Sequence, residues 1–555
     1  MKLLDLFSDN GKIYFRCYTQ KEELQYIPKI YNVYKRAYLL PSIYNIPFLL
    51  SLFDRDEVYI DNSFKEFQKF FEQHLRTLYL IKEGYKKVSR EELGIAGLKN
   101  PELVRDYQLT AITFAYTKKR VLIADEMGLG KSLVTIASTL LAKKNDGIKN
   151  VLIVCPNSVK KSVWEKEIKN WTNESCYIYD ATNKNKKPLN ELLEENFYTV
   201  INYESLRTKY TEVKDRIGCI VLDECHYIKN RRSQQTRAVK SLKSDFLLLL
   251  SGTPILNRVN ELWSLMDYID SGLFGKYWKF VERYCKVKDR YIGKGRKVLE
   301  ITGNKNVNEL KERIYPYYIR RTKDEVLNEL PERVYKDYVV NLHPTQIEIY
   351  NGIINQLKND ITKSRVKVDK LFVKSSLIRL LRVCDTTYGF INEDISSKFD
   401  LCIDILKRTV DEHKIVIFTW FIESARLLKK RVEEVGIKCV QIDGETKVEE
   451  RDKLIKQFHN EDDCRVLIAT IATCGLGVDL QVADVCIFIS RSFVPAMNDQ
   501  AESRLHRMGQ KKMVNVINII SDTYAERRVF EILKTKKDIF TEVFEEGLEN
   551  LFVEV

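Results

Sequence analysis

The chain has 555 residues, and because one hydrophobic core rarely serves so long a chain, roughly three or four domains are expected. Hydrophobic residues make up 44% and charged residues 30%, the proportions of a soluble globular protein. No apolar run reaches the length of about eighteen residues that a membrane span needs, and the N-terminus lacks the pattern of a secretory signal. We therefore expect no membrane association and a location in the cytoplasm or nucleoid, or in the nucleus of a eukaryotic host.

The net charge of +13 has the sign that suits a polyanion such as nucleic acid, although a lysine-rich composition explains it equally well. Twelve cysteines are scattered singly without a CxxC pair, and the six histidines are also spread out. Structural zinc sites need clustered ligands, so no zinc is expected.

Residues 1–92 are rich in Tyr, Phe and Leu and contain no phosphate or metal motif. Within them, residues 27–53 interleave aromatic, basic and proline residues. We interpret this region as an accessory module, which either packs around an aromatic core or docks on the rest of the chain and regulates it.

Residues 93–270 are predicted to form an α/β domain. Nearly continuous apolar strands that alternate with helical segments indicate a parallel sheet covered on both faces. The strand-like runs lie at 121–124, 151–155, 198–202, 218–222 and 246–251.

The same alternation of apolar strands and helical segments occurs in residues 396–535, which are predicted to form a second α/β domain. Between its first two strands lies an amphipathic helix with five apolar residues on one face, and Gly436 is expected to end it. These residues are Phe421, Ala425, Leu428, Val432 and Val435. Residues 271–395 are predicted to be a helical insertion and linker, and residues 536–555 a helical tail. The strand-like runs of the second domain lie at 414–419, 438–443, 465–469, 485–490 and 514–519.

A phosphate-binding loop is predicted where the strand 121–124 meets a helix. Its residues are Asp125, Glu126, Met127, Gly128, Leu129, Gly130, Lys131 and Ser132. Glycines allow backbone N–H groups to approach phosphates, Lys131 can reach the β- and γ-phosphates, and the Ser132 hydroxyl can bind Mg²⁺. The usual loop begins with Gly where this one has Asp125, but the flanking strand, the helix and the second glycine agree with a phosphate site.

Two acids, Asp223 and Glu224, directly follow the apolar run 218–222. Carboxylates are rarely placed at the end of a buried strand without a function. Nucleotide hydrolysis supplies one, in which Asp223 holds Mg²⁺ and Glu224 orients and deprotonates the attacking water. His226, which follows them, is either a coupling residue or a structural histidine.

The chain from about residue 100 to about 540 resembles superfamily-two helicases and more closely the Swi/Snf-like DNA translocases, and four segments are among those that carry the resemblance. They are DEMGLGKS at 125–132, DECHYIKN at 223–230, SGTPILNRVNELWSLMDYI at 251–269 and the run 466–510 that ends in QAESRLHRMGQ. The resemblance implies two RecA-like lobes, ATP and Mg²⁺ as cofactors, ATP hydrolysis, and double-stranded DNA as partner. It also implies that Gln108 reads the adenine, and that Arg504 and Arg507, three residues apart on one helix face, complete the nucleotide site.

The family positions imply two further sets of residues. Those that couple hydrolysis to movement are His226, Ser251, Thr253 and Gln500. Those that contact DNA are Asn157, Ser158, Lys160, Tyr203, Arg207 and Thr473.

The chain departs from the family pattern at Phe493-Val494-Pro495, where Trp-Asn-Pro is usual, and at Asp479, where Asn is common. Both departures concern elements that face DNA or couple the lobes. The N-terminal module resembles the substrate-recognition module of annealing-type family members, which implies contact with a DNA substrate or a protein partner.

Three functions remain open at this point. The first is a translocase on double-stranded DNA that remodels DNA or protein–DNA complexes. The second is a strand-separating or annealing DNA or RNA helicase, which a long β-hairpin or a winged-helix domain would favour. The third is an ATP-gated scaffold without productive hydrolysis.

Overall fold

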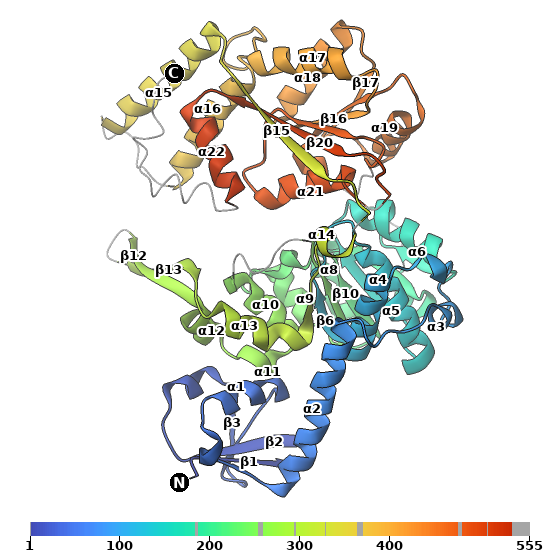
Figure 1. Ribbon diagram of the computed structural model, residues 1–555, viewed down its shortest axis with the longest axis vertical. Coiled ribbons are helices and arrows are strands. Elements are labelled where there is room, and N and C mark those ends of the chain that lie inside the picture. The colour runs from blue at the N-terminus through green and yellow to red at the C-terminus, as the bar shows by residue number, and fades with distance from the viewer. Residues whose placement is uncertain are drawn as a thin grey trace. The chain divides into compact units, whose positions relative to one another are not determined.

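The computed structural model of the chain divides into two compact units, Met1–Val326 and Leu327–Val555 (Figure 1). It describes residues 2–183, 187–252, 259–292, 296–327, 329–362, 370–474, 480–507 and 509–535. Among the predicted features, Thr253, Asp479 and the tail 536–555 lie outside the described residues.

Unit 1 begins with a small five-stranded sheet in the order β3-β4-β2-β1-β5. A long helix, α2, presents Phe64, Phe71, Leu78 and Ile81 to the core and runs from this sheet towards α4 (Figure 1). The strands are β1 (Leu4–Asp9), β2 (Lys12–Cys17), β3 (Ile30–Asn32), β4 (Ala37–Leu39) and β5 (Val58–Ile60), and the helices are α1 (Ile46–Ser51) and α2 (Asn62–Lys82).

The larger sheet of unit 1 has seven parallel strands in the order β14-β6-β11-β10-β7-β9-β8. Every residue of β7, β9, β10 and β11 is buried, which confirms the predicted α/β class. The strands are β6 (Arg120–Ile123), β7 (Val151–Cys155), β8 (Cys176–Ile178), β9 (Tyr198–Asn202), β10 (Cys219–Leu222), β11 (Phe246–Leu250) and β14 (Tyr318–Ile319).

The helices around this sheet include α5, which follows the phosphate loop, and α10 to α13, which lie between β11 and β14 in sequence. Their bounds are α3 (Arg90–Ile95), α4 (Asp106–Lys118), α5 (Lys131–Asp146), α6 (Lys166–Trp171), α7 (Leu189–Glu195), α8 (Tyr203–Lys209), α9 (Gln234–Lys240), α10 (Val259–Ile269), α11 (Ser271–Phe274), α12 (Tyr277–Tyr284), α13 (Val307–Ile314) and α14 (Lys323–Val326).

A β-hairpin interrupts the segment that the sequence analysis predicted to be helical. Strands β12 (Cys285–Ile292) and β13 (Arg296–Asn304) pair with each other and form a two-stranded sheet. In Figure 1 the hairpin projects away from the helices that carry it. Its alternating polar and apolar residues have the period of a strand, a signal that the surrounding helical pattern concealed.

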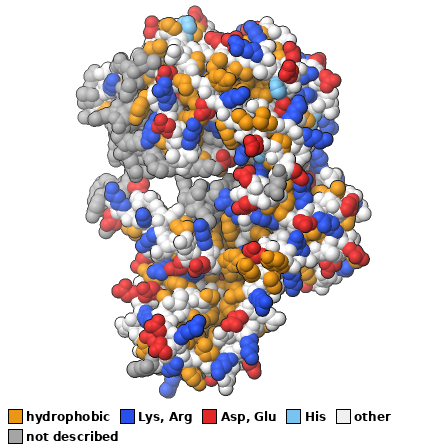
Figure 2. All heavy atoms as spheres, in the orientation of Figure 1, with side chains coloured by type: hydrophobic (Ala, Val, Ile, Leu, Met, Phe, Trp, Pro, Cys, Tyr) orange, Lys and Arg blue, Asp and Glu red, His pale blue; other side chains and the backbone are white. Residues whose placement is uncertain are grey.

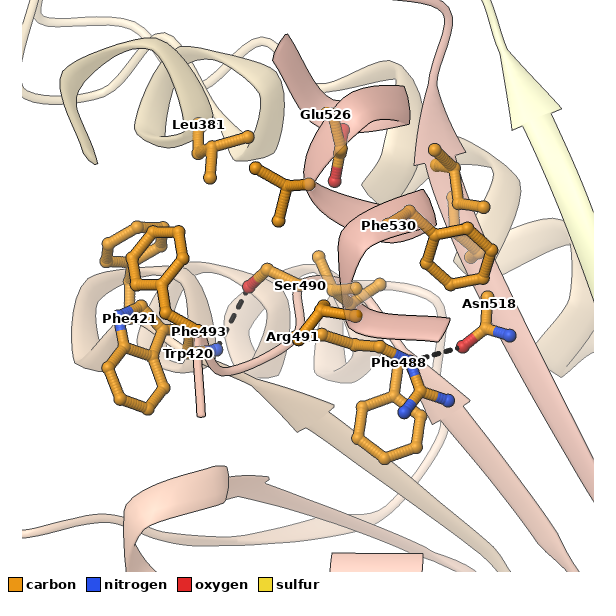
Figure 3. Close-up of a pocket in the computed structure, with 15 residues that line it drawn as sticks. Leu381, Trp420, Phe421, Phe488, Ser490, Arg491, Phe493, Asn518, Glu526 and Phe530 are labelled. Carbon is orange, nitrogen blue, oxygen red and sulfur yellow. Dashed lines mark hydrogen bonds between the residues drawn. The ribbon is translucent and has the colours of Figure 1, made fainter. Parts of the chain in front are cut away.

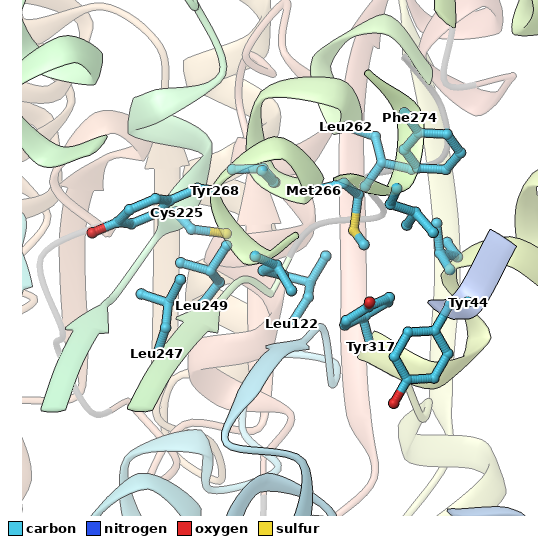
Figure 4. Close-up of a cluster of buried hydrophobic side chains, with 14 of the residues drawn as sticks. Tyr44, Leu122, Cys225, Leu247, Leu249, Leu262, Met266, Tyr268, Phe274 and Tyr317 are labelled. Atoms are coloured by element: carbon cyan, nitrogen blue, oxygen red, sulfur yellow. The ribbon is translucent and has the colours of Figure 1, made fainter. Parts of the chain in front are cut away.

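The N-terminal module packs directly on the larger sheet and its helices. One hydrophobic cluster contains Tyr44 of the module together with Leu122 of β6 and Tyr317, and Figure 4 shows these side chains close together. The Tyr44 and Tyr317 rings meet edge to face at 4.9 Å. In addition, the Asn45 amide donates to the Gly272 carbonyl at 2.9 Å and accepts from the Arg313 guanidinium at 2.6 Å.

Unit 2 contains a six-stranded parallel sheet in the order β15-β20-β19-β16-β18-β17. The strands are β15 (Arg333–Val340), β16 (Ile415–Thr419), β17 (Cys439–Ile442), β18 (Val466–Thr470), β19 (Val485–Phe488) and β20 (Val514–Ser521). The helices are α15 (Pro344–Thr362), α16 (Lys370–Asp385), α17 (Ser397–Thr409), α18 (Ile422–Glu434), α19 (Val448–Asn460), α20 (Ile471–Cys474), α21 (Pro495–Leu505) and α22 (Tyr524–Lys534).

The predicted helix before Gly436 is α18, which buries Ala425, Leu428 and Val432. Phe421 and Val435 lie just outside its two ends, and Val435 is exposed, so they do not belong to the buried face. Gly436 follows with a positive φ of 79°. Among the described helices of both units, none combines the length and apolar character that a membrane span requires.

Candidate active site

The predicted phosphate loop joins β6 to α5 at the carboxyl edge of the unit 1 sheet. Gly128 and Gly130 have φ values of 87° and 82°, a left-handed backbone that favours glycine. A Cβ atom at Gly130 would collide with the Gln108 amide, so a side chain here would have to displace Gln108 from its contact with the loop. Helix α5 begins at Lys131, which places its N-terminal N–H groups and positive dipole end at the loop.

Lys131 and Gln108 hold the loop from two sides. The Lys131 ammonium donates to the carbonyls of Asp125 at 2.8 Å and Glu126 at 3.2 Å. Buried Gln108 accepts from the Arg105 backbone N–H at 3.0 Å and donates to the Leu129 carbonyl at 3.2 Å. Its amide thus supports the loop, and the adenine contact stays a prediction.

Asp125, a predicted nucleotide contact, has its side chain engaged within unit 1. Its carboxylate is fully buried and forms a two-pronged ion pair with the Arg321 guanidinium. Glu126 is half-buried and accepts from the Lys323 backbone N–H at 2.8 Å. Leu129 is buried, whereas Met127 and Ser132 are half-buried at the loop surface.

Asp223 follows β10, and aromatic residues fix it in place. The Trp164 indole donates to its carboxylate at 2.9 Å, and the Tyr203 hydroxyl donates to its backbone carbonyl at 2.8 Å. Loss of solvent and the adjacent Glu224 carboxylate raise the pKa of Asp223 to about 6, while the indole hydrogen bond and the Lys131 charge act in the opposite direction.

Glu224 occupies a left-handed backbone conformation with φ of 51°, which is unusual for a residue with a side chain. Such conformations cluster at functional sites, where the surrounding structure stabilises them. One carboxylate oxygen of Glu224 lies 3.3 Å from the His226 Nδ1 atom, a distance at which a protonated imidazole would form an ion pair with this acid.

The end of β11 lies between the loop and the two acids, because β11 separates β6 from β10 in the sheet. Buried Ser251 donates its backbone N–H to the Ile123 carbonyl at 3.1 Å. The Lys131 ammonium lies 3.4 Å from the position that a Cβ atom on Gly252 would occupy. The loop lysine, Ser251 and the two acids therefore share one edge of the sheet.

The donor atoms at this edge fit a magnesium ion. Ser132 offers a hydroxyl oxygen and Asp223 a carboxylate, and Mg²⁺ prefers a few oxygen ligands of this kind together with water and substrate phosphates. One Asp223 oxygen accepts from the Glu224 backbone N–H at 3.0 Å and the other accepts from Trp164, which orients the carboxylate.

Gln500 and Arg504 lie on α21 in unit 2, but Arg507 does not share their helix. Helix α21 ends at Leu505, and His506 turns out of the helical conformation with φ of −89° and ψ of 81°. The His506 Nε2 atom lies 2.7 Å from the Pro331 carbonyl, which ties the turn to another segment. The expectation that both arginines lie on one helix face is therefore wrong, although both are half-buried.

Three of the predicted DNA contacts are buried and bonded inside their units. Lys160 donates to the Tyr179 carbonyl at 2.8 Å, Thr473 donates to the Thr470 carbonyl at 2.6 Å, and Tyr203 holds Asp223. Their polar groups are bonded within the fold, and their contact with DNA stays a prediction. Of the others, Asn157 and Arg207 are exposed and Ser158 is half-buried.

The departure at Phe493 has a structural explanation in unit 2. Its buried ring packs against Trp420 with centroids 6.0 Å apart, and Figure 3 shows the two rings together beside Ser490. The Ser490 hydroxyl accepts from the Trp420 backbone N–H at 3.0 Å. Phe493 therefore contributes to the core of unit 2.

Sequence reasoning missed the polar roles of Trp164 and Arg321. The Trp164 ring is buried in the core, but its N–H group contacts an acid 59 positions later. Arg321 contacts an acid 196 positions earlier. No local pattern signals such pairs.

Comparison with known proteins agrees with this geometry. A family model described as SNF2-related domain matches residues 59–388, more than half of the chain, and one described as helicase conserved C-terminal domain matches residues 397–509.

Curated relatives include a putative ATP-dependent helicase/translocase, YwqA, of Bacillus subtilis, which is 28% identical over 78% of this chain and 48% of its own length. Another is the Caenorhabditis elegans homologue of SWI/SNF-related matrix-associated actin-dependent regulator of chromatin subfamily A-like protein 1, 30% identical over 79% of this chain and 61% of its own length. An uncharacterized ATP-dependent helicase of Mycoplasma pneumoniae is 28% identical over 77% of this chain and 40% of its own length. The chain thus spans about half the length of these relatives.

Proposed function

The chain belongs to the SNF2-related family, the SWI/SNF branch of helicase superfamily two, and on this premise we propose that it hydrolyses ATP to move along double-stranded DNA. The observation that carries the proposal is the shared position of Lys131, Asp223 and Glu224 at one edge of the unit 1 sheet. Movement on DNA would serve to remodel DNA or protein–DNA complexes in the cytoplasm or nucleoid, or in the nucleus of a eukaryotic host.

Phosphoryl transfer depends mainly on positioning and charge stabilisation. Lys131 would leave the loop carbonyls and bind the β- and γ-phosphates. Ser132 and Asp223 would hold Mg²⁺, which when bound neutralises charge on the phosphates. Glu224, with His226 beside it, would take the proton of the attacking water.

Arg504 and Arg507 of unit 2 are proposed to stabilise the transferring phosphoryl group. Arginines in this role contribute a factor of about 10³–10⁵ in related enzymes. Because both arginines belong to unit 2 and the phosphate loop belongs to unit 1, hydrolysis would be fast only while the arginines reach the phosphates, and this dependence could couple turnover to movement.

The proposed track is supported by the basic charge of the chain and by exposed polar residues after the strands of unit 1. A motor that ignores sequence contacts mainly phosphates. Asn157 and Arg207 are exposed and suited to that contact. Ser158 is a weaker candidate because it is half-buried.

The test is ATP hydrolysis with duplex DNA, single-stranded DNA, RNA or no nucleic acid. We expect the largest stimulation from duplex DNA, and loss of turnover in Lys131→Ala and Glu224→Gln. Lys144→Ala changes an exposed lysine of the same helix α5 and serves as control. Nucleotide binding without turnover on any nucleic acid would indicate a scaffold, and stronger stimulation by RNA would exclude the proposed track.

Strand separation is a second candidate, and the β12–β13 hairpin favours it. Residues 285–305 contain seven Lys or Arg and two Asp or Glu, and Lys286 and Lys288 are exposed. An isolated two-stranded sheet is marginal in water, which suits a segment that works against a ligand. ATP-dependent displacement of a labelled strand decides between the candidates. Strand separation requires that Lys286→Gln with Lys288→Gln weaken displacement more than duplex-stimulated hydrolysis.

The N-terminal module is proposed to contact the DNA substrate or a protein partner. Tyr34, at the turn between β3 and β4, is 100% exposed, and Tyr31 and Val33 beside it are exposed as well. Figure 2 shows further hydrophobic side chains on the face that carries α2, where Phe70 and Tyr79 are exposed. The test measures ATP hydrolysis by Tyr34→Ala with duplex and with forked DNA. A changed preference between the two DNAs supports contact with the substrate, and an unchanged preference favours a role with protein partners.

A further inference from the structure

The last segment of unit 1 runs along the phosphate loop before the chain enters unit 2. Strand β14 pairs in parallel with β6, with Tyr318 opposite Leu122 and Ile319 opposite Ile123. Beyond the strands, the Ala124 N–H donates to the Ile319 carbonyl at 2.8 Å and the Glu126 N–H donates to the Arg321 carbonyl at 2.9 Å. The first residues of the loop are thus attached by backbone to the segment 318–326.

Arg321 reinforces this attachment with its side chain. Its Nε atom donates to an Asp125 carboxylate oxygen at 3.0 Å, a terminal nitrogen contacts the second oxygen, and the other terminal nitrogen donates to the Tyr107 carbonyl. The Arg321 backbone N–H also donates to Asp125 at 3.0 Å. Side-chain exposure is 13% for Arg321 and 1% for Asp125, so water competes little with this pair.

Lys323 provides a second link. Its backbone N–H donates to the Glu126 carboxylate at 2.8 Å, and its ammonium, on a side chain only 1% exposed, lies 4.0 Å from the other oxygen of Glu126. Two consecutive loop residues, Asp125 and Glu126, are therefore held by two residues of the segment 318–326.

The same two loop residues are the ones that Lys131 binds through their carbonyls. If Lys131 turns to a bound phosphate, the Asp125 carbonyl loses this donor and the Glu126 carbonyl keeps the Leu129 N–H at 3.3 Å, so the start of the loop can shift. The side chains of Asp125 and Glu126 would transmit that shift to Arg321 and Lys323.

We propose that Arg321 and Lys323 are positioning residues that couple occupancy of the phosphate loop to the segment leading into unit 2. The inference rests on the proposed function, because the occupant is the phosphate chain of ATP. It assigns the Asp-Glu pair that opens the loop to coupling within the protein and leaves nucleotide binding to the residues that follow.

The first experiment measures hydrolysis by the full chain with and without duplex DNA for Arg321→Lys and Arg321→Gln. A lysine keeps the charge but cannot form the two-pronged pair. We expect the stimulation by DNA to fall about tenfold in both variants, a typical coupling magnitude, while the KM for ATP changes less. Arg320→Gln, at the exposed neighbouring position, should behave like the wild type.

A double variant tests whether the ion pair itself carries the coupling. If it does, Asp125→Asn together with Arg321→Gln should lower stimulation about as much as either alone, roughly tenfold and not a hundredfold. Independent effects that multiply would overturn the role of the pair. Equal loss of basal and stimulated turnover, with lower thermal stability, would reduce Arg321 to a structural residue and also overturn the inference.

Hydrogen exchange separates this inference from the proposed function, because it needs no turnover. Binding of a non-hydrolysable ATP analogue should change exchange in the peptides that cover 124–132 and 318–327 of the wild type. In Arg321→Gln the analogue should still change exchange in the peptide 124–132 but no longer in the peptide 318–327. An analogue that alters the loop peptide alone in the wild type contradicts the coupling, whereas absence of hydrolysis with both changes present contradicts only the proposed function.

Discussion

Each unit encloses a cluster of charges near the ends of its sheet strands, and the two clusters differ in how completely they are satisfied. In unit 2, the fully buried Lys398 ammonium lies 3.1 Å from the Asp385 carboxylate, contacts Glu526, and donates to the Ile489 carbonyl at 2.9 Å. The other Asp385 oxygen accepts from the Ser490 hydroxyl at 2.9 Å.

In unit 1 only part of the cluster is enclosed. The pair of Asp125 and Arg321 is buried, but Lys131, Glu126 and Glu224 are half-buried beside it. Charges whose partners all belong to the fold can only hold it together, whereas charges that remain accessible can exchange a protein partner for a substrate. The comparison predicts that changes in unit 2 alter stability and that changes in unit 1 alter turnover.

The largest effect is expected from Lys398→Met. Removal of one partner leaves Asp385 and Glu526 buried without their cation, which typically costs about 3–5 kcal/mol of unfolding free energy. Chemical denaturation of the full chain should show early unfolding of unit 2, while unit 1 still binds nucleotide. Lys407→Met, at an exposed position of the same helix α17, is the control. Equal stability of the two variants would show that the cluster is dispensable.

The loss should also depend on pH. Burial already raises the pKa of Asp385 to about 6, and removal of the Lys398 charge would raise it further. The folded variant can then take up a proton at pH values where Asp385 of the unfolded chain stays ionised. The destabilisation by Lys398→Met should therefore be smaller near pH 5 than near pH 8, and a constant difference would contradict this account.

The contrast between the clusters also explains what the sequence could predict. The phosphate loop and the acids after β10 follow local rules, since a strand, a glycine-containing loop and a helix must be contiguous in sequence. The end of α18 at Gly436 is local in the same way. Asp125 and Arg321 are 196 positions apart, and Lys398 and Glu526 are 128 apart, so only the fold brings these partners together.

A smaller effect, on turnover, is expected from Trp164→Phe. The change keeps an aromatic ring in the core but removes the N–H group that orients Asp223 at 2.9 Å. A hydrogen bond to a charged group contributes about 1.5–3 kcal/mol, so kcat should fall roughly tenfold or more and half-maximal activity should need more Mg²⁺. Steady-state kinetics over a range of Mg²⁺ concentrations measures both.

Trp171→Phe provides the matched control for this prediction. Trp171 also donates its indole N–H to a carboxylate, that of Glu167 at 3.0 Å. Both residues of this pair belong to α6, so the hydrogen bond does not involve the acids after β10. Similar kinetics for the two variants would mean that the indole hydrogen bond does not position Asp223.

The smallest effect is expected from Ser42→Ala, where the N-terminal module contacts the rest of unit 1. The Ser42 hydroxyl donates to the Asp270 carboxylate at 2.6 Å, and the Tyr317 hydroxyl donates to the same carboxylate. Because Tyr317 remains, Asp270 keeps a donor, and the loss should be about 1 kcal/mol in the unfolding of unit 1. Ser51→Ala, whose hydroxyl bonds within the module to the Phe48 carbonyl at 2.8 Å, is the control. Thermal unfolding and duplex-stimulated hydrolysis, measured on the same variants, decide whether the Ser42–Asp270 contact serves stability or turnover. A loss of stability with unchanged stimulation assigns it to the fold, as in unit 2, whereas a loss of stimulation would make the module part of the motor's working cycle.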